Sequence, residues 1–266
     1  MLVEERYSEI QKILQQKKVV PIQELTELLN VSESTIRRDL SRMDSLGLLK
    51  KVHGGVKNSM PTYYLQNTAL NQREMENQEE KQRVGEYAAG LVTPGDFIYV
   101  DSGSSILAML DHLRVPGFRA VTNSARCAYK IAVAGNEVIL LSGHFNPILE
   151  ATVGFLTIQD IEKYNFSKGF FGVNGIHGAV GYSTPDSDDA AIKRTAMLHC
   201  KERYVLADPS KFNRISNISI TALKDATIIT TRVEEQFFAS FTTIIQVDDP
   251  ASGGKTRPPA PAEVRG

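Results

Sequence analysis

Short apolar runs alternate with segments of helical period along the second half of this 266-residue sequence. FIYVD (97–101) precedes ILAMLDHL (106–113), and AVTNS (120–124) precedes ARCAYKIAV (125–133). The later apolar runs occupy residues 137–143, 169–176, 203–208, 227–231 and 242–247, with a helix-like segment at 188–200 and a loop expected after Gly143. Because strands that alternate with helices form a mainly parallel sheet covered by those helices, the pattern predicts an α/β domain over residues 93–247.

The rest of the chain divides at changes in composition. Residues 1–57 have the pattern of three short helices and a strand pair, and a polar, proline-containing stretch then begins a linker. The charged segment 72–91 is expected to be a connecting helix, closed by Thr93-Pro94-Gly95. Residues 248–266 are rich in Pro and Gly with almost no apolar bulk, so we expect a disordered tail. The predicted segments are therefore 1–57, 58–92, 93–247 and 248–266.

Charge and cysteine usage exclude several classes of protein. Thirty basic and thirty-one acidic residues give a net charge of −1, so any electrostatic partner must be sought locally. No apolar run approaches the ~20 residues that cross a bilayer, and Cys127 and Cys200 form no C-x-x-C pair. The five histidines are scattered without metal-site spacing. We expect a cytoplasmic protein that does not act at a membrane and binds no metal or cofactor.

Residues 22–46 have the pattern of a helix-turn-helix. IQELTELL (22–29) forms the first helix, and Ser32 is suited to cap the second because its hydroxyl can accept from a free backbone N–H. At 100° per residue, Ile36, Leu40 and Met43 share the face of the second helix that packs inward. The opposite face carries hydroxyls and guanidinium groups that suit a DNA major groove, from Ser34, Thr35, Arg38, Ser41 and Arg42, with Arg37 on the flank.

The segment after this helix predicts a wing that contacts phosphates. LLKKVHGGVK (48–57) alternates like a strand around a Gly-Gly pair. From Ser34 to Lys57 there are six Lys or Arg against two Asp, a local balance of +4. The alternative is a solvated helix face whose arginines pair with Asp39 and Asp44. The predicted DNA-contacting residues are Ser32, Ser34, Thr35, Arg37, Arg38, Ser41, Arg42, Lys50, Lys51 and His53.

A second candidate site follows the first strand of the α/β domain. DSGSS (101–105) opens a helix, where free backbone N–H groups and serine hydroxyls suit an anion such as phosphate. Ligands of open α/β sheets bind beyond the carboxyl ends of the strands, so loops at other strand ends are expected to converge there. The predicted effector-binding residues are Asp101, Ser102, Gly103, Ser104, Ser105, Thr122, Asn123, Gly143, Asn174, Gly175 and Lys211.

The N-terminal pattern resembles the DeoR family of bacterial transcriptional regulators. The family's signature is matched by Arg6, Ile10 and Leu14, then by Ser32, Thr35 and Ile36-Arg37-Arg38-Asp39-Leu40, and by the wing residues VHGG (52–55). Asp39 is expected to orient an arginine, because a carboxylate repels phosphate. DSGSS, TNS, GVNGI, GYSTPD, AAIKRTAM and LADPSKF extend the resemblance to about residue 247, and GFFGVNGI with GYSTPD is similar to repressors of the phosphotransferase-operon type.

The resemblance implies a winged helix-turn-helix followed by a sensor domain similar to ribose-5-phosphate isomerase. It implies that residues 101–105 bind phosphate, that Asn123 and Asn174 bind sugar hydroxyls, and that Lys211 is a cationic contact. Lys193 lies on a predicted helix, where a solvated surface position is an alternative to a contact with the ligand, and the two cysteines are expected against apolar surface. The expected partners are double-stranded operator DNA, a phosphorylated sugar and further copies of the chain in a dimer or tetramer.

Two other functions stay open at this stage. One is a sugar-phosphate isomerase fused to a DNA-binding domain, for which Asp101, Asp186 or Asp208 could be the base. The other is an architectural DNA-binding protein whose C-terminal domain only oligomerises. We expect no catalysis, since a sensor gains nothing by turning over its signal. The sequence leaves open which sugar phosphate is sensed and whether it induces or corepresses.

Overall fold

The computed structural model describes residues 3–17, 19–45, 48–58, 62–64, 68–232 and 238–247. It divides into two compact units, one of residues 1–63 with 234–241 and one of residues 64–233 with 242–266. The predicted tail at 248–266, and the linker residues 59–61 and 65–67, lie outside the described residues. No described helix is long and apolar enough to pass through a lipid bilayer.

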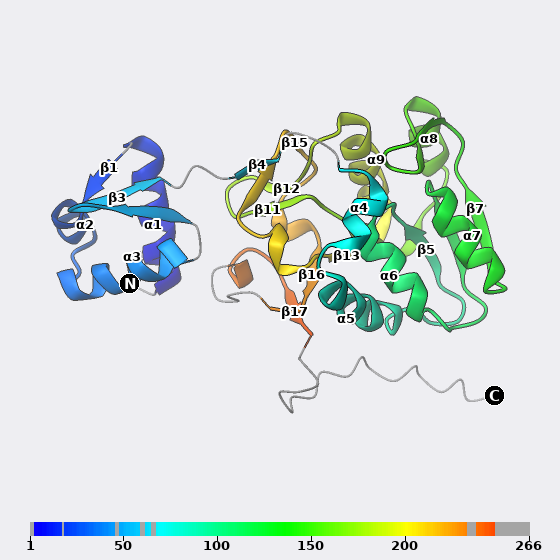
Figure 1. Ribbon diagram of the computed structural model, residues 1–266, viewed down its shortest axis with the longest axis horizontal. Coiled ribbons are helices and arrows are strands. Elements are labelled where there is room, and N and C mark those ends of the chain that lie inside the picture. Colours follow the sequence, from blue (N-terminus) through cyan, green and yellow to red (C-terminus); the bar gives the residue numbers. More distant parts are fainter. Residues whose placement is uncertain are drawn as a thin grey trace. The chain divides into compact units, whose positions relative to one another are not determined.

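Over its described residues between 3 and 58, the N-terminal unit combines three helices with a three-stranded antiparallel sheet (Figure 1). Its elements are α1 (Val3–Gln16), β1 (Val19–Pro21), α2 (Ile22–Leu29), α3 (Glu33–Ser45), β2 (Leu49–Val52) and β3 (Gly55–Asn58). The sheet order is β1-β3-β2, so the predicted strand pair β2–β3 gains the unpredicted strand β1. A glycine is required at position 55, where β3 pairs with β1, because a Cβ there would lie 2.6 Å from the Val20 carbonyl oxygen.

The predicted helix-turn-helix is confirmed in this unit. Asn30 ends α2 in the left-handed conformation, with φ of 50° and its N–H bonded to the last turn. That reversal brings α3 back across α2 and α1, where Ile36, Leu40 and Met43 are fully buried. The predicted inward face of α3 is therefore the face that packs.

The C-terminal unit is built on a seven-stranded sheet in which every described pairing is parallel. The strand order is β17-β16-β13-β10-β5-β6-β7. These strands are β5 (Phe97–Val100), β6 (Arg119–Thr122), β7 (Glu137–Leu140), β10 (Phe166–Gly172), β13 (Cys200–Leu206), β16 (Thr227–Thr230) and β17 (Ile244–Gln246). The predicted parallel α/β domain is confirmed.

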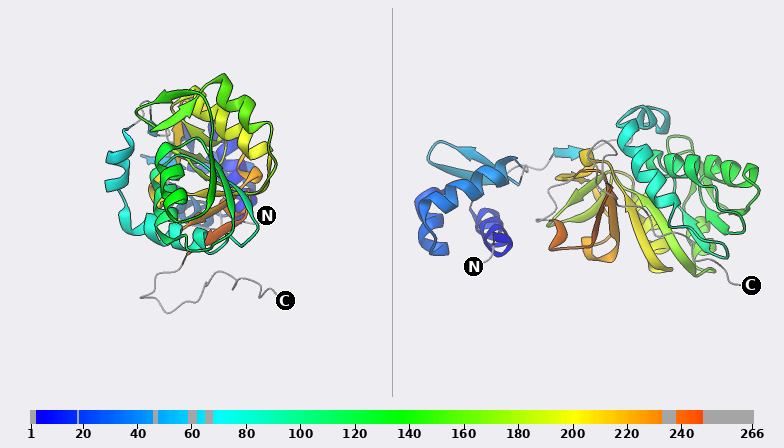
Figure 2. Two further views of the ribbon diagram at one scale, coloured as in Figure 1. Left: turned by 90° about the vertical axis from the view of Figure 1, so that its right-hand side faces the viewer. Right: turned by 90° about the horizontal axis from the view of Figure 1, so that it is seen from below.

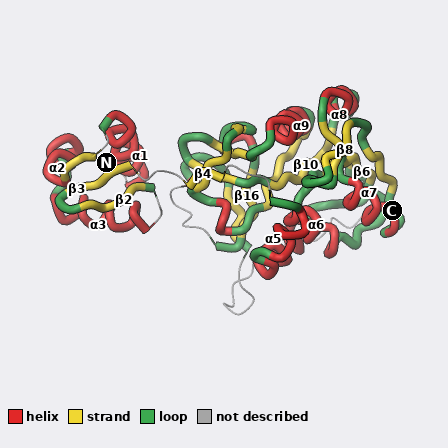
Figure 3. The backbone as a smooth tube through the Cα atoms, turned by 45° about the horizontal axis from the view of Figure 1, so that its top comes forward, coloured by secondary structure: helices red, strands yellow, loops and turns green. Residues whose placement is uncertain are grey.

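Helices cover both faces of this sheet (Figures 1 and 2). The helices are α4 (Leu70–Met75), α5 (Gln78–Ala89), α6 (Ser104–His112), α7 (Ala125–Val133), α8 (Phe155–Ile161) and α9 (Ser187–Leu198). Figure 3 shows α5, α6 and α7 together beside the strands. Their apolar residues share one core with Ile98, Val100 and Phe170 of the central strands. The other face carries Tyr99 and Phe171, whose rings stack, and α9 packs against β10 and β13.

Shorter elements complete the unit. They are β4 (Thr62–Tyr64) at the boundary between the units, β8 (His144–Asn146), β9 (Ala151–Val153), β11 (Gly175–His177), β12 (Gly181–Thr184), β14 (Arg214–Ser216), β15 (Ile218–Ser219) and two 3-10 turns, Pro209–Lys211 and Leu223–Asp225. The loop expected after Gly143 is wrong, because residues 144–161 form the β8–β9 hairpin and α8.

The predicted connecting helix differs in two ways. It is broken into α4 and α5 at Asn77, which has a φ of 50°. It also belongs to the body of the C-terminal unit, because Leu70, Val84 and Ala88 are buried in the unit's core.

Candidate functional sites

A small cavity opens at the carboxyl ends of the central strands β5 and β10, where ligands of open α/β sheets bind. Its volume is about 20 Å³. Its lining residues are Arg73, Ser102, Gly103, Ser104, Ser105, Leu149, Gly172, Val173, Asn174, Asp189, Lys193 and Lys211. Three cations and a helix start therefore converge on one point.

The first turn of α6 supplies hydrogen-bond donors to this cavity. β5 ends at Val100, and α6 begins at Ser104 without a side-chain cap. The first helical N–H to find its acceptor is that of Leu107, which donates to the Gly103 carbonyl. The Ser102 hydroxyl lines the cavity, is 5% exposed and has no hydrogen-bond partner among the described residues. Unmatched donors at a helix N-terminus are suited to an anion.

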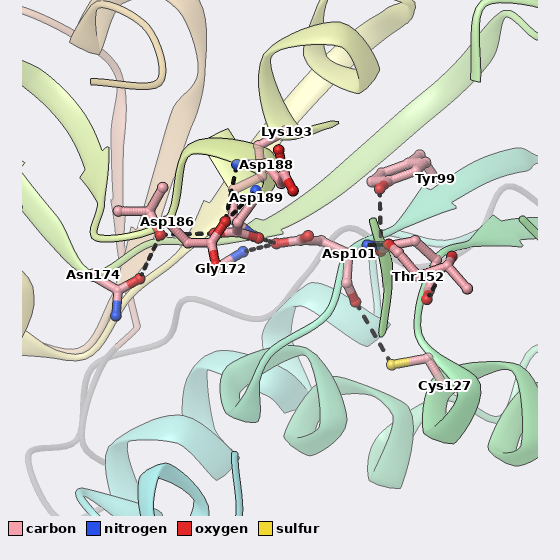
Figure 4. Close-up of polar contacts among 12 residues, drawn as sticks. Tyr99, Asp101, Cys127, Thr152, Gly172, Asn174, Asp186, Asp188, Asp189 and Lys193 are labelled. Carbon is pink, nitrogen blue, oxygen red and sulfur yellow. Dashed lines mark hydrogen bonds and ion pairs between the residues drawn. The ribbon is translucent and has the colours of Figure 1, made fainter. Parts of the chain in front are cut away.

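A buried ion network forms one wall of the cavity (Figure 4). One Asp101 carboxylate oxygen accepts from the Gly172 N–H at 2.9 Å and from Lys193 Nζ. Lys193 Nζ also lies 3.0 Å from an oxygen of Asp189, whose other oxygen accepts from Thr184 at 2.7 Å. Of the two alternatives for Lys193, the solvated surface position is wrong, because its side chain is 3% exposed.

The protonation of this network follows from its geometry. Burial raises the pKa of Asp101, and the adjacent Lys193 opposes that shift. Burial alone would lower the pKa of Lys193, but Asp101 and Asp189 outweigh it and raise the pKa. One lysine thus lies between two carboxylates, while the second Asp101 oxygen, Oδ1, is buried without a hydrogen-bond partner among the described residues.

The structure brings together part of the predicted effector set. Ser102 to Ser105, Asn174 and Lys211 line the cavity, and Asp101 lies directly behind its wall. Asn174 Oδ1 accepts from the Thr184 hydroxyl at 3.1 Å. Lys211 Nζ lies 3.8 Å from Asp208. These residues come from three separate parts of the sequence, as the convergence of strand ends predicts.

The other predicted effector residues do not line this cavity. The Asn123 side chain is 1% exposed, accepts from the Tyr99 hydroxyl at 3.3 Å and donates to the Thr152 carbonyl at 3.0 Å. Thr122 Oγ1 accepts from a backbone N–H at 3.0 Å. A Cβ on Gly143 or Gly175 would meet neighbouring atoms at 2.2 and 2.6 Å, respectively. All four are held by contacts within the fold.

Sequence reasoning missed several lining residues. Arg73, Leu149 and Asp189 belong to no motif that the sequence displays. Asp189 could have been found from its i, i+4 spacing to Lys193 on α9, which places the two side chains on one face. Asp186 and Asp208, considered above as possible catalytic bases, instead accept backbone N–H groups at the starts of α9 and of the Pro209–Lys211 turn.

The exposed face of α3 carries the predicted DNA-contacting groups. Ser34, Arg37, Arg38, Ser41 and Arg42 are exposed and Thr35 is half-buried. Arg38 makes no hydrogen bond or ion pair with a described residue, whereas Arg37 pairs with Glu33 at 2.6 Å. Ser32 accepts from the Thr35 N–H at 3.4 Å, a weak form of the predicted cap.

The predicted wing lies beside this face. Lys50, Lys51 and His53 are exposed on β2 and the following turn. Lys51 Nζ donates to the Ser41 hydroxyl of α3 at 3.0 Å, and the Lys51 N–H donates to Asp44. Basic groups of helix and strand therefore share one surface, which suits the phosphates that border a groove.

Asp39 lies on the opposite, buried side of α3 and contacts Arg6 of α1. Arg6 Nε lies 2.7 Å from Asp39 Oδ2, and their side chains are 8% and 4% exposed. The expectation that Asp39 orients an arginine is confirmed, and the arginine is Arg6 of the N-terminal signature. The alternative in which Asp39 neutralises the exposed arginines of α3 is wrong.

The described residues contain no group of three or more His, Cys, Asp or Glu side chains that could hold a metal ion. Both cysteines are buried, as expected, and burial raises the pKa of each thiol to about 12.

Known proteins match the chain in both units. Residues 6–61 match the DeoR-like helix-turn-helix domain, and residues 76–232 match the DeoR C-terminal sensor domain. An HTH-type transcriptional regulator of Bacillus subtilis, FruR, is 38% identical over 94% of this chain and 100% of its own length. The lactose phosphotransferase system repressor of Staphylococcus aureus is 31% identical over 92% of this chain and 98% of its own.

Solved structures give a weaker likeness. Ribose 5-phosphate isomerase A from Methanocaldococcus jannaschii is 16% identical over 52% of this chain and 55% of its own, with a TM-score of 0.40, which is too low to support an argument. The family of the chain is shown by the two domain matches and by the relatives that match over almost their full length. The chain belongs to the DeoR family of helix-turn-helix transcriptional regulators.

Proposed function

We propose that the chain represses a sugar-utilisation operon and that a phosphorylated sugar in the C-terminal unit changes its affinity for operator DNA. The single observation that carries this proposal is the cavity at the start of α6, where the buried, unpartnered Ser102 hydroxyl and free helix N–H groups face Lys211 and Arg73. Such donors match the oxygens of a phosphate monoester. The relatives named as lactose phosphotransferase system repressors support the sugar class.

The DNA-binding half of the proposal rests on α3 and β2. Their shared surface presents Arg38, Arg42 and Lys51, and the opposite face of α3 is fully packed. In the proposed complex, α3 enters the major groove and the wing lysines contact phosphates. Two or four copies of the chain would present paired α3 helices to half-sites about 34 Å apart or a multiple of that distance.

The effect of the ligand on operator binding follows from thermodynamic linkage between the two binding equilibria. A sugar phosphate can lower operator affinity only by as much as it prefers the arrangement that does not bind DNA. Repression relieved by the metabolite is the direction we propose. The isomerase alternative has little support, because two of its three candidate bases, Asp186 and Asp208, accept backbone N–H groups in helix caps.

A mobility-shift assay tests the proposal directly. The full chain is first used to select an operator from a random pool of DNA duplexes, and hexose 1- and 6-phosphates are then titrated against the complex. We expect one of them to release the operator, and Ser104→Glu to bind DNA normally but to ignore the ligand, since a carboxylate at the helix start repels phosphate. A chain that selects no duplex, or binds none of the sugar phosphates, would contradict the proposal.

A further inference from the structure

Arg73 reaches the effector cavity from a segment that neither domain match includes. It lies on α4, between the helix-turn-helix match that ends at residue 61 and the sensor match that begins at residue 76. Nothing in the sequence motifs assigns it a role, yet its side chain lines the cavity together with Ser102, Lys193 and Lys211. It is therefore a cation brought to the site by the fold alone.

The three cations of the cavity differ in what already neutralises them. Lys193 contacts both Asp101 and Asp189, and Lys211 lies 3.8 Å from Asp208. No hydrogen bond or ion pair joins the Arg73 guanidinium to any described residue, and its Nε is buried without a partner. Burial accordingly lowers the pKa of Arg73, while Asp189 and Asp101 act on it only from beyond ion-pair distance. Arg73 is the cation with donors available to a ligand.

The backbone that carries Arg73 is held firmly. Lys81 of α5 donates to the Arg73 and Glu76 carbonyls at the end of α4, the second at 2.6 Å. Glu74 makes a two-pronged pair with Arg126 of α7, at 2.7 and 2.9 Å. Leu70 is 1% exposed in the core. These contacts fix α4 on both sides while they leave the guanidinium without an acceptor, which is an arrangement suited to a ligand contact.

The size of the cavity adds a second argument. Its 20 Å³ is far below the roughly 300 Å³ of the smallest usual ligand pockets. A sugar phosphate can therefore enter only if lining side chains move. Moving Lys193 would break a buried ion network, which is costly. The Arg73 side chain, unlike that of Lys193, breaks no ion pair when it turns, so it can move without that cost.

We propose that Arg73 is a specificity-determining contact of the effector site, in which its guanidinium fork binds the anionic group of the ligand opposite the start of α6. The inference rests on the proposed function and deepens it, because it makes the phosphate, rather than the sugar hydroxyls, the group that α4 recognises. The ligand class is a phosphate monoester, since planar guanidinium donors match two phosphate oxygens at once. A neutral sugar would offer Arg73 hydroxyl oxygens but no negative charge to match the guanidinium.

Calorimetric titration of the full chain with a panel of hexose 1- and 6-phosphates, and with inorganic phosphate as a separate probe, tests this role. Arg73→Gln should weaken binding of the best sugar phosphate about 10- to 100-fold, the usual cost of losing a hydrogen bond to a charged group. Arg73→Lys should recover part of that loss. Arg83→Gln is the matched control, because Arg83 also has a buried, unpartnered Nε but lies on α5 outside the cavity lining. It should bind as the unmodified chain does.

Each outcome decides a different point. Equal binding by Arg73→Gln and the unmodified chain would overturn the role of Arg73 and leave the proposed function standing. Equal losses in Arg73→Gln and Arg83→Gln would also overturn it, since the effect would then be general to the fold. No binding of any sugar phosphate by the unmodified chain would remove the proposed function and this inference with it. Weaker binding of inorganic phosphate by Arg73→Gln would place the contact on the phosphate itself.

Discussion

Removing either partner of the Arg6–Asp39 pair should destabilise the N-terminal unit far more than an exposed charge would. At 2.7 Å and an effective dielectric constant of 20, the gross attraction is about 6 kcal/mol. Much of this offsets desolvation, because the side chains are 8% and 4% exposed. Each single substitution leaves the other member of the pair as a buried charge without its partner. Arg6→Met or Asp39→Leu should therefore each lower the free energy of unfolding by about 3 to 5 kcal/mol.

The double variant separates this explanation from simple loss of packing. With both Arg6→Met and Asp39→Leu, no buried charge is left unpaired, so the total cost should fall well below the sum of the single costs. Hydrogen exchange followed by mass spectrometry suits the measurement, because the chain has no Trp and peptides from residues 3–58 report this unit within the full chain. A loss of less than about 1 kcal/mol of unfolding free energy in each single variant would refute the reasoning. So would a loss in the double variant equal to the sum of the two single losses.

Three further predictions concern other parts of the molecule. Gly85→Ala should lower the melting temperature through a loss of about 1 to 3 kcal/mol, because the new Cβ would lie 2.6 Å from the Met109 nitrogen of α6; an unchanged melting curve would contradict this. Cys127 and Cys200, with pKa values raised to about 12, should stay unlabelled by a thiol reagent at pH 8 until denaturant is added. Since unfolded thiols ionise near pH 9 and folded ones do not, stability should also fall as the pH rises above 9. Arg38→Ala should lose about 1 to 3 kcal/mol of operator binding in a mobility-shift assay, and an unchanged affinity would remove Arg38 from the interface.

The parts of the fold that were predictable are those whose signal is local. The inward face of α3 follows from the spacing of Ile36, Leu40 and Met43, and the parallel sheet follows from repeated alternation. β1 escaped notice because three residues that end in Pro21 show too little alternation to indicate a strand. The break at Asn77 was also missed, because an isolated left-handed residue within a charged helical pattern leaves no clear mark.

The candidate site was harder to predict because its energetics depend on distant residues. Lys193 reads as a surface lysine, and only the approach of Asp101, 92 positions earlier, makes its burial tolerable. Arg73 belongs to no motif, so its place in the cavity depends on how α4 packs beside α6 and α7. Thr122 and Asn123 do follow a strand end as expected, but hydrogen bonds within the fold use their side chains.

The strand order also governs how the polypeptide is assembled during synthesis. Val100 of β5 pairs with Phe170 of β10, 70 positions later, so β5, β6 and β7 emerge from the ribosome before the four other described strands of the sheet. Until β10 follows, β5 presents an unpaired apolar edge, the kind of surface on which nascent chains aggregate. The N-terminal unit has finished its local pairings by then. The nascent chain should therefore need chaperones most while the middle third of its mRNA is being translated.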